Sequence, residues 1–150
     1  MRQPLEINAP VPPPVSVLSV SPLADDFLTL KAIVGHSRWS LFQADTFPGA
    51  LTFLREKPVS VVLCERDLPP QTWIDLYQNL QNLSTPPCLI VTSRLADERL
   101  WAEALNLGAW DVLAKPFERS EVLRTVKSAW QHWYDRASRP PAALVRRAAS

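Results

Sequence analysis

The sequence is poor in glycine, cysteine and histidine, and these shortages argue against several classes of functional site. Three glycines, two cysteines and two histidines occur among 150 residues. No glycine-rich loop follows the first strand-like segment, which argues against a dinucleotide or P-loop site. His36 and His132 show no metal-ligand spacing with the cysteines, so a zinc site is not expected. Cys64 and Cys88 each lie in an apolar run and are expected to be small buried residues.

The chain also lacks long apolar runs and any excess of basic residues over its main part. No segment approaches the roughly 20 apolar residues of a membrane span, and residues 1–7 lack the apolar core of a signal peptide. These absences predict a cytoplasmic protein with no membrane partner. The formal net charge is +1, yet residues 136–150 hold four arginines and no acid. The remainder is therefore mildly acidic, which argues against nucleic acid as a partner, although an accessory role through the arginine-rich end would reveal itself by a steep salt dependence.

Proline is abundant, with fifteen residues that gather toward the two ends of the chain. Residues 1–14 contain five prolines, a composition typical of a flexible, partly polyproline-II segment. The basic residues 136–150 are likewise expected to form a flexible tail. Residues 15–135 are long enough and apolar enough to form one domain with its own core.

Within this domain, short β-branched runs alternate with segments of helical periodicity. Strands are predicted at 15–20, 39–44, 59–64, 88–93 and 111–114. The predicted helices begin near Leu23, Pro48, Ile74, Leu100 and Val122. The residues expected to form their buried stripes are Leu23, Phe27, Leu30 and Val34; Ile74, Tyr77, Leu80 and Leu83; Leu100, Ala104 and Leu107, before a closing Gly108; and Val122, Val126, Trp130 and Trp133.

Five strand–helix units with apolar strands predict a doubly wound α/β fold, a parallel sheet covered by helices on both faces. In such sheets the functional crevice lies beyond the carboxyl ends of the strands. The residues that follow the third, fourth and fifth strands there are Glu65, Thr92 and Lys115. An acid, a hydroxyl and a lysine are therefore expected to converge. No Ser/His/Asp or Cys/His arrangement accompanies them, and we do not expect an enzyme.

Three motifs, in this order and on these elements, resemble the receiver domain of two-component response regulators, in particular the chemotaxis regulator. In "CERDLPP", Glu65 stands at the phosphoacceptor position normally held by aspartate. In "IVTS", Thr92 takes the switch hydroxyl position, and "GAWDVLAKPF" supplies Lys115 before a Pro116 expected to be cis. The resemblance covers residues 15 to about 134. It implies a flavodoxin-like (βα)5 three-layer sandwich with strand order 2-1-3-4-5.

The sequence departs from this family at the metal site and at the switch. The family binds Mg²⁺ through an acidic pair after the first strand, and these positions hold Ser21 and Pro22. A hard divalent cation prefers carboxylate oxygens, so we expect Mg²⁺ binding to be lost and no cofactor to be needed. The aromatic switch position is Val112, which has no ring. Asp25 and Asp26 are interpreted as first-turn acids favoured by the helix dipole, in preference to displaced metal ligands.

Glu65 itself admits more than one interpretation. It places a permanent negative charge opposite Lys115 and Thr92, where the family places a phosphoryl group. The ion pair could simply fill a vacant pocket, it could lock the domain in an active-like state as a phosphomimetic, or some phosphorylation could remain. Asp67, two residues before Pro69, is an alternative acceptor, but a solvated loop carboxylate is the favoured interpretation.

Tryptophan is abundant, with six residues in this chain, and it gives a further indication of function. Trp101, Trp110, Trp130 and Trp133 fall near the fourth helix, fifth strand and fifth helix, the face through which family members dimerise or meet targets. The sequence thus predicts a stand-alone degenerate receiver, without an output domain, that acts by protein–protein interaction with a histidine kinase, a downstream effector or itself. The alternative is an Mg²⁺-dependent receiver that accepts phosphate from a histidine kinase.

Overall fold

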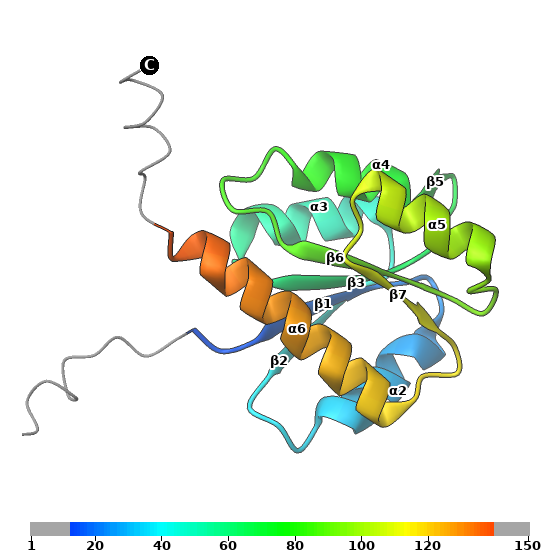
Figure 1. The fold of residues 1–150 in the computed structure, drawn as a ribbon, viewed down its shortest axis with the longest axis horizontal. Coiled ribbons are helices and arrows are strands. Elements are labelled where there is room, and N and C mark those ends of the chain that lie inside the picture. The colour runs from blue at the N-terminus through cyan, green and yellow to red at the C-terminus, as the bar shows by residue number, and fades with distance from the viewer. Residues whose placement is uncertain (1–12, 140–150) are drawn as a thin grey trace, which may run out of the picture.

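The computed structural model describes residues 13–139, which form a parallel five-stranded sheet between two layers of helices (Figure 1). The strand order β2-β1-β3-β6-β7 is the expected 2-1-3-4-5 arrangement. The strands of this sheet are β1 (Ser16–Val20), β2 (Ser40–Ala44), β3 (Val61–Glu65), β6 (Cys88–Ser93) and β7 (Asp111–Ala114). The helices are α2 (Ala24–Val34), α3 (Phe47–Glu56), α4 (Trp73–Leu80), α5 (Glu98–Leu107) and α6 (Arg119–Ala137). The two tails expected from composition lie mainly in residues 1–12 and 140–150, outside the described residues.

The sheet is buried on both faces, which explains why its strands are almost continuously apolar. One core cluster joins Leu18, Val62 and Val91 to α3, α4 and α5, and the other joins Val61 and Ile90 to α2 and α6. Figure 1 shows α3, α4 and α5 along one face of the sheet and α2 and α6 along the other. This doubly wound arrangement confirms the predicted fold class.

The buried faces of three helices differ from the predicted stripes. Leu23 precedes α2 and is 45% exposed, and the buried face of that helix begins instead at Asp26. In α4 the buried residues are Trp73, Leu76 and Leu80, because Thr72 and Asp75 form a capping box that starts the helix at Trp73. The predicted stripe of α5 holds at Leu100 and Ala104, but Leu107 is exposed.

A short hairpin between β3 and α4 was not predicted. Its strands are β4 (Asp67–Leu68) and β5 (Gln71–Thr72), joined at Pro69-Pro70, whose peptide bond is cis. The hairpin buries Leu68 in the core cluster beneath α4. Period-two alternation cannot be recognised over strands of two residues, so the sequence suggested a plain loop here.

Both cysteines are free and buried, as predicted. Burial, assisted by the charge of Glu65, raises the pKa of the Cys64 thiol well above its ordinary value. Burial also raises the pKa of Cys88, partly offset by Arg136. Neutral thiols in apolar strands behave as small hydrophobic side chains. Among the helices of residues 13–139, none is both long and apolar enough to cross a membrane.

We expect Gly108→Ala to destabilise the fold. Gly108 caps α5 in the left-handed region at φ 117°, and an added Cβ would lie 2.1 Å from the hydroxyl oxygen of Tyr77. The left-handed backbone alone costs roughly 1–2 kcal/mol for a residue with a Cβ. The measurement is the free energy of unfolding in urea. Gly49→Ala, in the first turn of α3, is the control and should lose less than Gly108→Ala; equal losses would contradict this account.

Candidate functional site

The sheet register brings the polar residues of three strands to one edge. Glu65, the last residue of β3, lies beside Thr92 of β6, and Ser93 of β6 lies beside Ala114, the last residue of β7. The backbone N–H of Lys115 then donates to the carbonyl of Ser93 at 3.0 Å. Because all these strands are parallel, their carboxyl ends coincide, and the predicted convergence of acid, hydroxyl and lysine is observed.

The ammonium of Lys115 is the centre of this site. Its Nζ donates to Oε1 of Glu65 at 2.5 Å and to Oδ2 of Asp26 at 2.8 Å. The side chains of Lys115, Asp26 and Glu65 are 4%, 10% and 12% exposed. Thr92 donates from its hydroxyl to the same oxygen of Glu65 at 3.3 Å. One buried cation is thus shared by two carboxylates, and their charges partly compensate the desolvation of each group.

Asp25 and Asp26 both lie in the first turn of α2, as the sequence indicated, but Asp26 does more than face the helix dipole. Asp25 is exposed, whereas Asp26 is buried against Lys115. The burial of Asp26 is indicated by its spacing in the sequence, because Asp26 stands four residues before Leu30 and seven before Ile33, on the buried face of α2. A carboxylate on the buried face of a helix needs a cation opposite it. Because the predicted buried face was counted from Leu23, Asp26 was not assigned to it.

Ser21 and Pro22, which stand where the family has its acidic pair, differ in role. Ser21 is buried, and its hydroxyl donates to Oδ2 of Asp26 at 2.7 Å while accepting from the backbone N–H of Leu23 at 3.0 Å. Pro22 is exposed and offers no hydrogen-bonding group. Ser21 therefore orients the carboxylate that α2 supplies from one turn further along the chain.

Asp67, the alternative acceptor, does not reach Lys115. Its carboxylate is half exposed and pairs with Arg66 at 3.0 Å on the surface of the hairpin. A side-chain hydrogen bond from Arg66 to Asp67 raises the pKa of the arginine. Glu65 is consequently the carboxylate of "CERDLPP" that belongs to the site.

The remaining positions of the motifs occupy the places expected from their order. The peptide bond between Lys115 and Pro116 is cis, as predicted. Val112 is buried on β7 in the core cluster on the α3, α4 and α5 side. An aliphatic side chain there packs into the core and presents no hydrogen-bonding group.

The four tryptophans proposed as one partner surface differ in exposure. Trp101 is on α5 and 49% exposed. Trp110, Trp130 and Trp133 are half buried against the other core cluster, beneath α2 and α6. Trp110 stacks on His132 with ring centroids 4.8 Å apart, whereas Trp133 lines a cavity at the amino ends of the strands, beside Val59. The helical spacing of Trp130 and Trp133 marked a face that packs inward.

The residues at this edge of the sheet do not form a good Mg²⁺ site. Within residues 13–139, no group of three or more His, Cys, Asp or Glu side chains is placed to hold a metal ion. The two carboxylates that meet, Asp26 and Glu65, both accept from Lys115, which already supplies a cation. The family's pattern would add a further acid, where this chain has a hydroxyl and a proline. A dication would thus meet less negative charge here and an ammonium beside it.

Variants that each remove one charge should show how Glu65 and Asp26 share the ammonium of Lys115. We expect Lys115→Met to cost about 3–5 kcal/mol of unfolding free energy, because it leaves two buried carboxylates without a cation. Glu65→Gln and Asp26→Asn should each cost less, since the other carboxylate still pairs with the lysine. The Lys115→Met/Glu65→Gln double variant should lose less than the sum of its singles. Urea unfolding measures all four, and additive losses would show that the groups do not interact.

Comparison with known proteins agrees with this geometry. Residues 25–127 match the family model described as the response regulator receiver domain. The transcriptional regulatory protein KdpE of Mycobacterium tuberculosis H37Rv is 32% identical over 91 residues, which is 61% of this chain and 40% of KdpE. The chain therefore corresponds to less than half of that relative's length.

Solved receiver domains share the fold at lower identity. The signal receiver domain of an HD domain-containing protein from Pseudomonas fluorescens Pf-5 superimposes with a TM-score of 0.79 at 22% identity, covering 88% of this chain and 98% of its own. The beryllofluoride-activated NtrC4 receiver domain dimer gives 0.72 at 22% identity, covering 79% and 98%. With a family model that matches most of its length, the chain belongs to the response regulator receiver domains of two-component signalling.

Proposed function

We propose that this receiver works without phosphorylation, as a protein-interaction module whose Glu65 stands permanently where a phosphorylated aspartate would stand. The observation that carries this proposal is the contact of Glu65 with both Lys115 and Thr92. The family resemblance implies that these two residues respond to the phosphoryl group. Here a carboxylate one methylene longer than aspartate holds both of them without any modification.

Two further features support independence from phosphate. The ammonium of Lys115 and the hydroxyl of Thr92 both contact Oε1 of Glu65, and these charge-assisted hydrogen bonds lower the nucleophilicity of the carboxylate. The residues present fit Mg²⁺ poorly, and phosphoryl transfer to a carboxylate depends on charge neutralisation of the phosphate. Phosphoryl transfer would thus meet a weakened nucleophile without the ion that accompanies it.

The interaction surface we propose comprises α5, β7 and α6, which adjoin the site through Lys115 at the end of β7. Trp101 supplies exposed aromatic area on α5, with Leu105 beside it on the same helix. Exposed aromatic residues are frequent anchors in protein interfaces. The NtrC4 receiver forms a dimer in its activated state, which supports a second copy or another signalling protein as the partner of this chain. Phosphate acceptance from a histidine kinase is the competing function.

Incubation with Mg²⁺ and a small phosphodonor, such as acetyl phosphate, should leave the protein unmodified by intact mass spectrometry. Millimolar Mg²⁺ should produce no saturable change in tryptophan fluorescence and no rise in melting temperature. We expect no response because Asp26 and Glu65 already share the ammonium of Lys115, and because Ser21 and Pro22 replace the acidic pair of the family. A Ser21→Asp/Pro22→Asp/Glu65→Asp variant, which restores the family's residues, is the positive control. A phosphorylated native chain would instead establish the competing function.

Measurements of partner binding should distinguish a phosphomimetic role of Glu65 from a purely structural one. We expect Glu65→Gln to weaken association with a captured partner, or self-association by sedimentation, while circular dichroism shows the fold intact. Asp26→Asn is the matched control, since it removes a charge from the same lysine but leaves Glu65 in contact with Thr92. If both variants bind like the native chain, Glu65 serves the stability of the pocket alone.

A further inference from the structure

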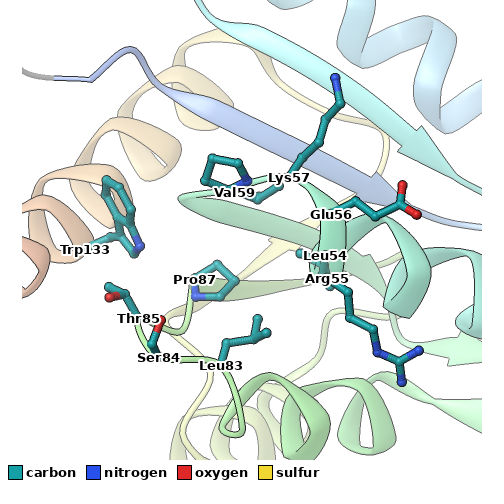
Figure 2. Close-up of a pocket in the computed structure, with 11 residues that line it drawn as sticks. Leu54, Arg55, Glu56, Lys57, Val59, Leu83, Ser84, Thr85, Pro87 and Trp133 are labelled. Atoms are coloured by element: carbon teal, nitrogen blue, oxygen red, sulfur yellow. The ribbon is translucent and has the colours of Figure 1, made fainter.

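A groove at the opposite end of the sheet from Lys115 has no assigned role. It is a cavity of about 400 Å³ at the amino ends of β3 and β6 (Figure 2). It is larger than the cavity of about 290 Å³ beside Asp26 and Lys115. The lining side chains that carry the argument are Leu54, Val59, Leu83, Thr85, Pro87 and Trp133. We call this cavity the amino-end groove.

The amino-end groove is lined mainly by apolar side chains, with the hydroxyl residues Ser84 and Thr85 in one wall and charged residues at one rim. Figure 2 shows Arg55, Glu56 and Lys57 with their charged ends pointing away from Trp133 and Pro87. Apolar walls without an inward charge favour an uncharged occupant. The occupant must nevertheless contribute hydrogen-bond acceptors.

The need for an acceptor comes from Trp133. Its indole Nε1 is buried and has no hydrogen-bond partner among the described residues. Figure 2 shows this nitrogen on the side of the ring that faces Thr85 and Pro87. Buried indole N–H groups are usually paired, and an unpaired one is unfavourable. A carbonyl brought into the groove could satisfy it after a small rotation of the ring.

A proline-rich peptide combines these properties. In the polyproline-II conformation its carbonyls have no internal partner and its rings present an apolar surface. Aromatic-lined grooves recognise such segments because the peptide loses little entropy on binding. A wall that contains a tryptophan with a free N–H fits this class of ligand.

The chain itself carries such a segment next to the groove. Residues 4–12 contain three prolines, and the exposed Pro13 and Pro14 connect them through Val15 to β1. The backbone N–H of Ser16 donates to Oγ of Ser60 at 3.1 Å, and Ser60 follows Val59 of the groove wall. At ~3.1 Å per residue, this segment is long enough to cross the groove from that point.

Charge distinguishes the two ends of the chain as occupants. Residues 1–14 contain one arginine and one glutamate, whereas residues 140–150 contain two arginines and no acid. The rim carries Arg55, Lys57 and one acid, Glu56, and this net positive charge favours a neutral segment over a basic one. The amino-terminal segment is the better match.

We propose that residues 4–12 of this chain bind in the amino-end groove, with prolines of this segment against Trp133 and Pro87 and one carbonyl accepting from the Trp133 indole. The contact is intramolecular. It rests on the groove and the unpaired indole, independently of the role proposed for Glu65.

The test uses the full chain with a nitroxide attached at Asn8→Cys, because both native cysteines are buried. Paramagnetic broadening of indole N–H signals is read by NMR. Trp133 should lose most of its signal, while Trp39 should keep most of its own. Trp39 is the matched reporter, since the neighbouring Ser40 bonds to Val15 at the start of β1 and a merely tethered label would visit it equally. Equal broadening of both reporters would overturn the proposal.

Two variants of the labelled chain test the specific contact. Replacing Pro4, Pro10 and Pro12 by serine should remove the selective broadening of the Trp133 signal. Ser84→Glu places a charge at the exposed edge of the groove without disturbing the core, and should do the same. Retention of the broadening in both would refute docking through proline at this groove.

Two further arms identify other occupants. In the first, chain that carries the nitroxide but no isotope label is mixed with isotope-labelled chain that carries no nitroxide, so that any broadening reports contacts between molecules. Broadening seen only in this mixture would make the occupant a second copy. A nitroxide at Ala148→Cys reports the other end of the chain. Selective broadening of Trp133 from that position alone would assign the groove to residues 140–150. Either result overturns the intramolecular proposal.

Discussion

The buried ammonium of Lys115 is the constraint on which the carboxyl edge of this domain depends. A cation with almost no exposure to water must be compensated by nearby anions, and Asp26 and Glu65 reach it from two different elements. The site is therefore a closed network in which Ser21 and Thr92 supply the remaining hydrogen bonds. Removing any one charge affects the balance of the other two.

This network explains why the chain tolerates the loss of residues that its family otherwise keeps. A receiver that has exchanged its acid pair for serine and proline would leave the lysine with one counter-ion. Asp26 restores the second from one turn into α2, at a position where a helix of this kind normally buries an apolar side chain. Glu65 and Asp26 thus form one arrangement around Lys115.

The two ends of the sheet differ in chemistry. The carboxyl ends carry the charged site, because loops there follow strands whose last residues are polar. The amino ends carry the apolar groove beside Trp133, where β3 and β6 begin. Parallel strands separate these two surfaces by the full length of the sheet, so each can engage a different ligand.

The sequence by itself determined the apolar strands and the meeting of Glu65, Thr92 and Lys115, because periodicity locates each strand and the carboxyl ends of parallel strands coincide. The strand order was implied by the resemblance to receiver domains. It also determined that Cys64 and Cys88 would be buried. The tertiary structure decided the partner of Asp26, since the phase of α2 depends on packing against α6 and β2 and cannot be read from Leu23. It likewise decided that Trp130 and Trp133 pack inward, because a helical stripe shows which residues share a face but not what covers that face.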